Sequence, residues 1–77
     1  MPIMKVATPA DSIANELRVE FFRRGLNHQT VSEISGLSTS AVSRRLNGVV
    51  SPTLDELDRL AAAADLTVEV RLVERAA

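Results

Sequence analysis

The stretch GLSTSAVSRRLNG, residues 36–48, places a run of hydroxyl residues and two arginines on what its spacing predicts to be a short helix. A glycine stands at each end of the stretch, and Ser38 is a residue type that caps helix N-termini. Val42 and Leu46 are four residues apart and form the only apolar stripe. Small hydroxyl side chains and arginines cannot build a core, so the helix expected over residues 39–47 should present them to a polar partner.

The residues before this stretch predict two more helices. Residues 9–24 open with a capping box from Thr8 to Asp11 and then repeat apolar residues at four-residue spacing. Residues 28–35 follow Asn27, which can cap them, and end at a glycine that adopts a left-handed conformation without strain. The side chains expected to face inward from these two helices are Ile13, Leu17, Phe21, Val31 and Ile34.

The residues after the stretch predict a fourth helix and then a strand. Thr53 and Glu56 form a second capping box, which opens a helix over residues 54–64. Residues 67–73 alternate apolar and polar side chains and are rich in β-branched types, the pattern of a strand. The inward positions of the fourth helix are expected to be Leu54, Leu57, Leu60, Ala61 and Ala64.

The strand expected at residues 67–73 has no second strand in the chain to pair with, and an unpaired strand is not stable in water. The simplest partner is the same strand of a two-fold related copy, running antiparallel. If Val70 faces its own copy, Glu69 lies opposite Arg71 of the mate. An apolar tail folded onto its own domain is the alternative. The residues assigned to the dimer strand are Val68, Glu69, Val70, Arg71 and Leu72.

Size and composition narrow the class of protein. The 77 residues are expected to form one domain, residues 1–77, whose single core is small. Hydrophobic residues make up 45%, and the only aromatics are Phe21 and Phe22, so the core should be aliphatic. The absence of cysteine excludes disulfides and thiolate metal sites, and a lone histidine argues against a metal site or an enzyme. No apolar run has the length of a membrane span, so a cytoplasmic protein without cofactor or membrane contact is expected.

The net charge of −1 is unevenly distributed. Residues 23–50 carry four arginines against one glutamate, whereas residues 51–77 carry three arginines against six acids. The basic segment coincides with the helices expected at 28–35 and 39–47. Excess positive charge attracts phosphate, so the distribution of charge predicts a nucleic-acid partner where the total does not.

Two short helices joined by a tight turn at a glycine predict a helix-turn-helix, whose second helix lies in the major groove of DNA. The run NHQTVSEISGLSTSAVSRRLNG, residues 27–48, resembles the helix-turn-helix of the lambda-repressor-like family, also called Xre or Cro/cI-type. The resemblance covers about residues 11–66, including SPTLDELDRLAAAADL, which is similar to the next helix of that family. The motif is also similar to lac-repressor-type headpieces, and the expected strand resembles that of small dimeric antitoxins of the HipB kind.

The resemblance implies which residues would contact DNA. The family's base-reading positions fall on Thr39, Ser40 and Arg44, and the lac-type comparison selects the same three. Arg44 is the foremost of them, because arginine bound to guanine is the commonest specific contact. The family's phosphate contact at the start of the first motif helix falls on His28. Further candidates for phosphate contacts are Ser38, Ser43, Arg45 and Asn47.

The sequence departs from the family pattern in places. The family often pairs an arginine in its first helix with a glutamate near the end of the second motif helix, and those positions here are Phe21 and Leu46. An apolar pair can replace a buried ion pair at little cost. Arg45 and Ser35 occupy positions that are usually apolar, and the rotation of the second motif helix is therefore expected to differ from that of the family.

The expected fold is mainly α: a four-helix lambda-repressor-like helix-turn-helix domain followed by one C-terminal β-strand that pairs across a dimer. The expected function is a sequence-specific transcriptional repressor that binds double-stranded DNA as a homodimer at a palindromic operator. A small phage or prophage repressor and the antitoxin of a toxin–antitoxin pair, which would add a toxin partner, are both open. The alternative is a protein-interaction module that retains the fold without specific DNA binding.

Overall fold

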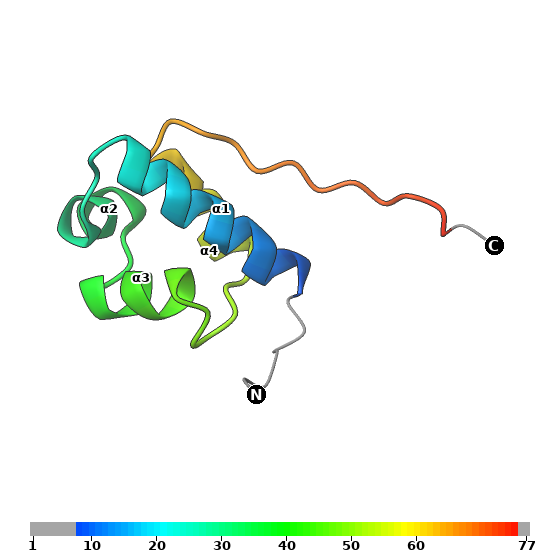
Figure 1. Cartoon of the computed structure of the whole chain (residues 1–77), viewed down its shortest axis with the longest axis horizontal. Coiled ribbons are helices and arrows are strands. Elements are labelled where there is room, and N and C mark those ends of the chain that lie inside the picture. The colour runs from blue at the N-terminus through cyan, green and yellow to red at the C-terminus, as the bar shows by residue number, and fades with distance from the viewer. Residues whose placement is uncertain (1–7, 76–77) are drawn as a thin grey trace.

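A computed structural model describes residues 8–75 and shows four helices packed around one aliphatic core (Figure 1). The helices are α1 (Pro9–Arg23), α2 (His28–Ser35), α3 (Thr39–Leu46) and α4 (Leu54–Ala62). The expected mainly helical fold with four helices is therefore confirmed within this part of the chain. Helices α1 and α3 end one residue earlier than expected, and α4 ends two residues earlier.

Every helix begins at a side-chain cap, as the sequence predicts. Each cap residue has extended backbone, and its side-chain oxygen accepts a hydrogen bond from the backbone N–H three residues on. In the boxes that begin α1 and α4, the acid at that third position also accepts from the backbone N–H of the cap. These contacts satisfy donors that a helix N-terminus leaves free. The caps are Thr8, Asn27, Ser38 and Thr53.

Two serines of α2 hold the turn between α2 and α3. The Ser32 hydroxyl donates to the backbone carbonyl of Leu37, and the Leu37 N–H donates to Ser35 Oγ at 3.2 Å. Ser35 is buried, so a small side chain at this point also lets the helices approach closely. Gly36 leaves α2 with a φ of +77°, a left-handed conformation that disfavours a side chain. Both backbone polar groups of Leu37, its N–H and its carbonyl, are therefore hydrogen-bonded to serines of α2, which fixes the turn.

The core lies among the four helices, where α1 and α2 each pack against both α3 and α4. Its largest fully buried side chains are Val31 on α2, Val42 on α3, and Leu57 and Leu60 on α4. The rest of the buried cluster consists of Ala14, Leu17 and Phe21 from α1, Leu46 from α3, and Ala61, Ala63 and Ala64 from α4 and the turn after it. The positions of the family's ion pair, Phe21 and Leu46, are thus both part of the apolar core.

Two residues expected to face inward are exposed instead. Ile34 is 53% exposed, because the inward position at the end of α2 is taken by its neighbour Ser35, which the turn requires there. Leu54 is 59% exposed, since it is the first residue of α4 and precedes by one turn the side chains that reach the core. Both predictions were wrong for the same reason. At the end of a helix, the neighbouring turn or cap decides which side chain faces the core, and the spacing of apolar residues does not.

Residues 66–75 form a tail that leaves the four-helix body. Asp65 has a φ of +58°, and the Leu66 N–H donates to the Ala61 carbonyl at 2.9 Å, which closes the end of α4 and redirects the chain. Leu66 and Val68 pack against the core, and the chain then extends away from the body (Figure 1). No strand occurs between residues 8 and 75, so the strand expected at 67–73 and its pairing are not seen in the single chain.

None of the helices in the described range is long and apolar enough to cross a membrane.

We expect Gly36→Ala to lower the free energy of unfolding by about 1–2 kcal/mol, because a left-handed residue with a Cβ costs that much. No atom lies within 4 Å of a Cβ built at this position, so the loss is conformational rather than steric. Gly36→Asn should cost less, since asparagine tolerates the left-handed region. Urea denaturation of the three proteins measures the difference, and an asparagine variant as unstable as the alanine variant would contradict this interpretation.

Candidate nucleic-acid interface

The three predicted base-reading residues of α3 are all exposed. Val42 and Leu46 are buried on the opposite side, whereas Thr39 and Ser40 in the first turn and Arg44 one turn later are exposed. Residues four apart on a helix are neighbours on its surface. Ser40 and Arg44 therefore share one surface of α3, and Thr39 is exposed at its N-terminal end, the end that a recognition helix brings to the base edges.

Arg44 is the one arginine of residues 23–50 without an acidic partner among the residues described. Glu20 binds both Arg23, at 2.8 Å, and Arg24, at 3.1 Å. Arg45 is held by Glu56. The basic excess seen in the sequence is therefore smaller at the surface than the count of charges suggests, although exposed pairs such as Arg23 with Glu20 are weak and can open.

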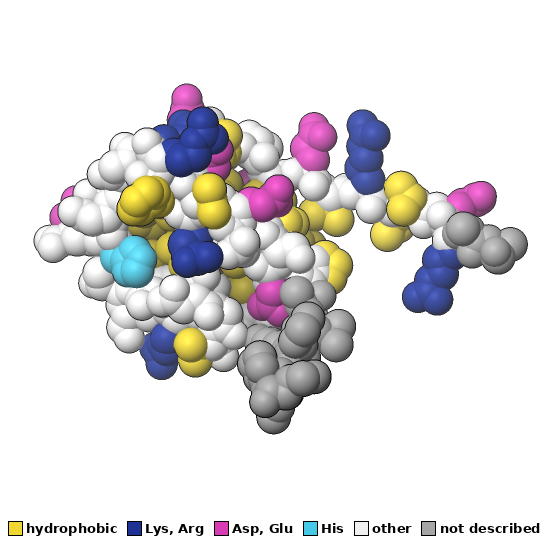
Figure 2. Space-filling model, viewed as in Figure 1, with side chains coloured by type: hydrophobic (Ala, Val, Ile, Leu, Met, Phe, Trp, Pro, Cys, Tyr) yellow, Lys and Arg dark blue, Asp and Glu magenta, His cyan; other side chains and the backbone are white. Residues whose placement is uncertain are grey.

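The start of α2 offers hydrogen-bond donors to an anion. The Asn27 side chain accepts from Thr30 N at 2.8 Å, and the Asn27 carbonyl accepts from Val31 N. The preceding amides, those of His28 and Gln29, have no acceptor within residues 8–75. His28 is half-buried and lies beside a hollow that Arg18 and Phe22 also line; it is the cyan side chain in Figure 2.

The other predicted phosphate contacts are spread along α3. Ser38 is occupied as the cap, where its oxygen accepts from Ala41 N at 3.1 Å, and its hydroxyl proton can still be donated. Ser43 accepts a hydrogen bond from Asn47 Nδ2 at 3.3 Å, so these two side chains lie against each other at the end of the helix. Asn47 is exposed and Ser43 is half-buried.

Arg45 has a structural partner that the sequence did not reveal. Its Nε donates to Glu56 Oε2 at 2.9 Å, and the other oxygen of Glu56 accepts from Thr53 N, also at 2.9 Å. Only 20% of the Arg45 side chain and 17% of the Glu56 side chain are exposed. One carboxylate therefore joins the last turn of α3 to the first turn of α4. A phosphate contact by Arg45 would have to use its remaining guanidinium donors.

The sequence predicted Glu56 as part of a capping box with Thr53, but it did not predict the ion pair of Glu56 with Arg45. A capping box is a local pattern, whereas Arg45 is eleven residues away, across the loop between α3 and α4. The usually apolar character of the Arg45 position was the only sequence signal. An arginine there needs an acid on the facing helix, and Glu56 is that acid.

Contacts with Thr53 and Arg45, together with burial, shift the pKa of Glu56. The hydrogen bond from the Thr53 backbone, which is the largest cause, and the Arg45 guanidinium lower the pKa of this carboxyl below its ordinary value, against a smaller opposing effect of burial. The ionised carboxylate is therefore favoured in the folded chain, and Glu56 contributes stability above its unfolded pKa, near 4.5. That contribution is lost as the pH falls through the lower, folded pKa.

We expect Glu56→Gln to lower the free energy of unfolding at pH 7 by about 1 kcal/mol, because a charge-assisted pair and part of a cap are lost. The difference between the wild type and the variant should shrink as the pH falls from 5 toward 3. Asp58→Asn, which neutralises an exposed acid of α4, is the matched control and should change little. Urea denaturation across that pH range measures the difference, and a gap that stays constant would rule out the Arg45–Glu56 link as its source.

Helices α2 and α3, the turn at Gly36 and the exposed side of α3 define a helix-turn-helix protein of the DNA-binding class. The sequence profile of the helix-turn-helix family HTH_3 matches residues 13–70, and the chain belongs to this family. The lambda-repressor-like resemblance is thereby confirmed, and DNA binding and transcription regulation are the functions of the family. Searches of curated proteins and of solved structures found no match to this chain.

Proposed function

We propose that this chain is a transcriptional repressor that binds a palindromic DNA operator as a homodimer. The observation that carries the proposal is the composition of the exposed side of α3. Arg44, without an acidic partner in the described range, stands one turn after two exposed hydroxyl residues, Thr39 and Ser40. These are small and hydrogen-bonding side chains around one guanidinium, on the helix that this class of protein inserts into the major groove.

Each residue has a distinct task in the proposed complex. Arg44 binds O6 and N7 of one guanine, and the two hydroxyls of the first turn of α3 contact neighbouring base edges. The free amides at the start of α2, with His28, bind a backbone phosphate and so set the position of α3 in the groove. Further phosphate contacts are assigned to Ser38, Ser43, Asn47 and the remaining donors of Arg45.

Two copies are needed for a palindromic site. Residues 67–73 pair with the same residues of a second copy as an antiparallel ribbon, with Val70 on the two-fold axis. The tail leaves the body on a side away from α3 (Figure 1), so this pairing leaves α3 uncovered. The two copies of α3 would then enter successive major-groove faces about 34 Å apart.

The regulator can be a phage or prophage repressor or the antitoxin of a toxin–antitoxin pair. Phe22, 87% exposed at the end of α1, and Val49, 70% exposed after α3, are apolar contact points that DNA binding does not require. They fit a protein partner such as a toxin. The same residues would serve a protein-interaction module that lacks specific DNA binding, which is the alternative function.

We expect Arg44→Ala to weaken binding to a preferred duplex by roughly 10- to 100-fold, equivalent to about 1–3 kcal/mol for a lost bidentate contact. The duplex is enriched from a random pool by the wild-type protein, and binding is followed by fluorescence anisotropy at two salt concentrations. Arg59→Ala is the matched control, because Arg59 is an exposed arginine on α4 that pairs with Asp55 at 3.6 Å.

Binding to a scrambled duplex separates the possible outcomes. The proposal expects Arg44→Ala to lose preference for the enriched duplex while both variants lose affinity in higher salt. Equal effects of Arg44→Ala and Arg59→Ala would remove Arg44 from base reading. Failure of the pool to enrich any sequence would favour the protein-interaction module.

A further inference from the structure

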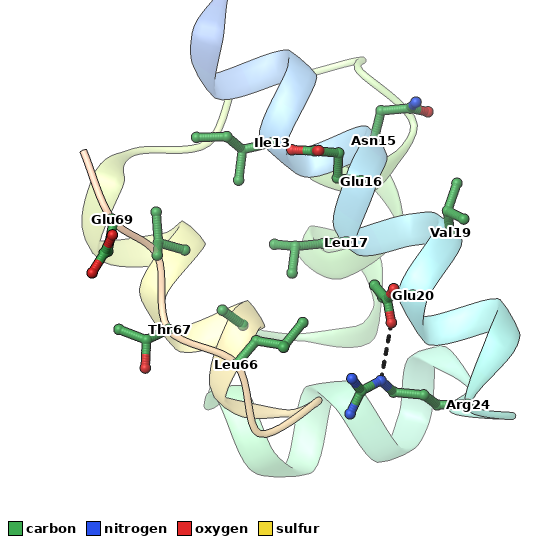
Figure 3. A pocket seen from close by; sticks show the side chains of 12 residues that line it. Ile13, Asn15, Glu16, Leu17, Val19, Glu20, Arg24, Leu66, Thr67 and Glu69 are labelled. Carbon is green, nitrogen blue, oxygen red and sulfur yellow. Dashed lines mark hydrogen bonds and ion pairs between the residues drawn. The ribbon is translucent and has the colours of Figure 1, made fainter. Parts of the chain in front are cut away.

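A groove of about 560 Å³ lies between α1 and the first residues of the tail (Figure 3). Ile13 and Leu17 of α1 point into it from one side, and Leu66 lies on the other. Val19 of α1, Ala61 of α4 and Val68 of the tail complete its apolar lining, and polar and charged side chains form its rim. The tail and α1 run side by side here in opposite directions, with the groove open between them (Figure 3).

The apolar face of the tail continues beyond the body that it packs on. Leu66 and Val68 are half-buried against the core, but Val70 is 60% exposed and Leu72 is 100% exposed. These four residues alternate along the chain, so an extended tail carries them on one face. Charged and hydrophobic side chains both stand free along the outer part of the tail in Figure 2. The tail therefore covers its own body with its first half only.

We propose that this groove binds the Leu72 side chain of a second copy of the chain. In the dimer, each copy inserts its Leu72 into the groove of the other. The inference rests on the homodimer proposed above and names the surface that stabilises it. A two-stranded ribbon alone is marginal in water, so paired tails need an apolar face to pack against. The groove supplies that face, because it borders the tail and is lined by Ile13 and Leu17.

The register of the pairing follows from the charges of the tail. With Val70 opposite itself, Glu69 of each copy lies opposite Arg71 of the other, so unlike charges meet on both sides of the axis. A shift of two residues in either direction places Glu69 opposite Glu69 or Arg71 opposite Arg71. A shift of one residue sets the apolar face of one tail against the polar face of the other.

The same register delivers Leu72 to the groove. Leu72 of one copy lies opposite Val68 of the other, and Val68 lines the groove. Glu74 of the second copy then lies opposite Leu66, at the end of the groove where Arg24 is also found. Arg24 already binds Glu20 and the Ala64 carbonyl, so this end of the groove adds no free base to the pairing. Both the apolar and the charged side chains of the outer tail gain partners that they lack in a single chain.

Leu72→Asp should weaken dimerisation at least about 100-fold, because two buried leucines per dimer are replaced by charged groups. Val73→Asp is the matched control: Val73 is 83% exposed, and in this register it points to the other face of the ribbon. Sedimentation equilibrium measures the dimer dissociation constant. Leu72 has no contact with its own body, so its variant keeps the fold, which the helical circular dichroism signal checks.

Filtered nuclear Overhauser spectra of a dimer mixed from labelled and unlabelled chains show directly which residues of one copy Leu72 of the other copy contacts. The proposal expects contacts between Leu72 methyl groups of one copy and those of Ile13 or Leu17 of the other. A dimer in which Leu72 contacts only Val68 would contradict the binding of Leu72 in the groove, while the proposed homodimer would still hold. A chain that stays monomeric at millimolar concentration would contradict both the homodimer and the binding of Leu72 in the groove. The Arg44 experiment would still test sequence-specific DNA binding in that case.

Discussion

The orientation of α3 depends on the burial of one side of it, through Val42 and Leu46, against the other three helices. The core that receives them is small and aliphatic, apart from Phe21, and both side chains are buried in it. A rotation of α3 would expose Val42 and bury hydroxyls or a guanidinium, whose desolvation is costly without partners. Burial of one side therefore decides which residues the other side presents.

Polar contacts fix both ends of the same helix. At its start, Ser32 and Ser35 close the turn that leads into α3, and at its end Arg45 binds the carboxylate that caps α4. A helix of eight residues is not stable alone, so its position must come from such contacts and from its apolar stripe. The result is a helix held in place before DNA arrives, which lowers the cost of ordering on binding.

The sequence predicted what depends on neighbours along the chain. The four caps, the glycine exit at Gly36 and the exposed hydroxyls of α3 are local features, and the apolar period located most of the core. Ile34 and Leu54 failed because helix ends follow turns and caps. The link from Arg45 to Glu56 could not be predicted from spacing, since it joins two helices across a loop. The predicted strand needs a second chain, so a single chain does not test it.

The direct test of DNA reading by a pair of α3 helices is a hydroxyl-radical footprint on the duplex that the protein prefers, combined with guanine N7 methylation interference. We predict two protected tracts related by a two-fold axis, with centres about one helical turn apart, and one guanine in each half whose methylation blocks binding. A single asymmetric tract, or binding that is indifferent to methylation in the major groove, would contradict the proposed mode of recognition.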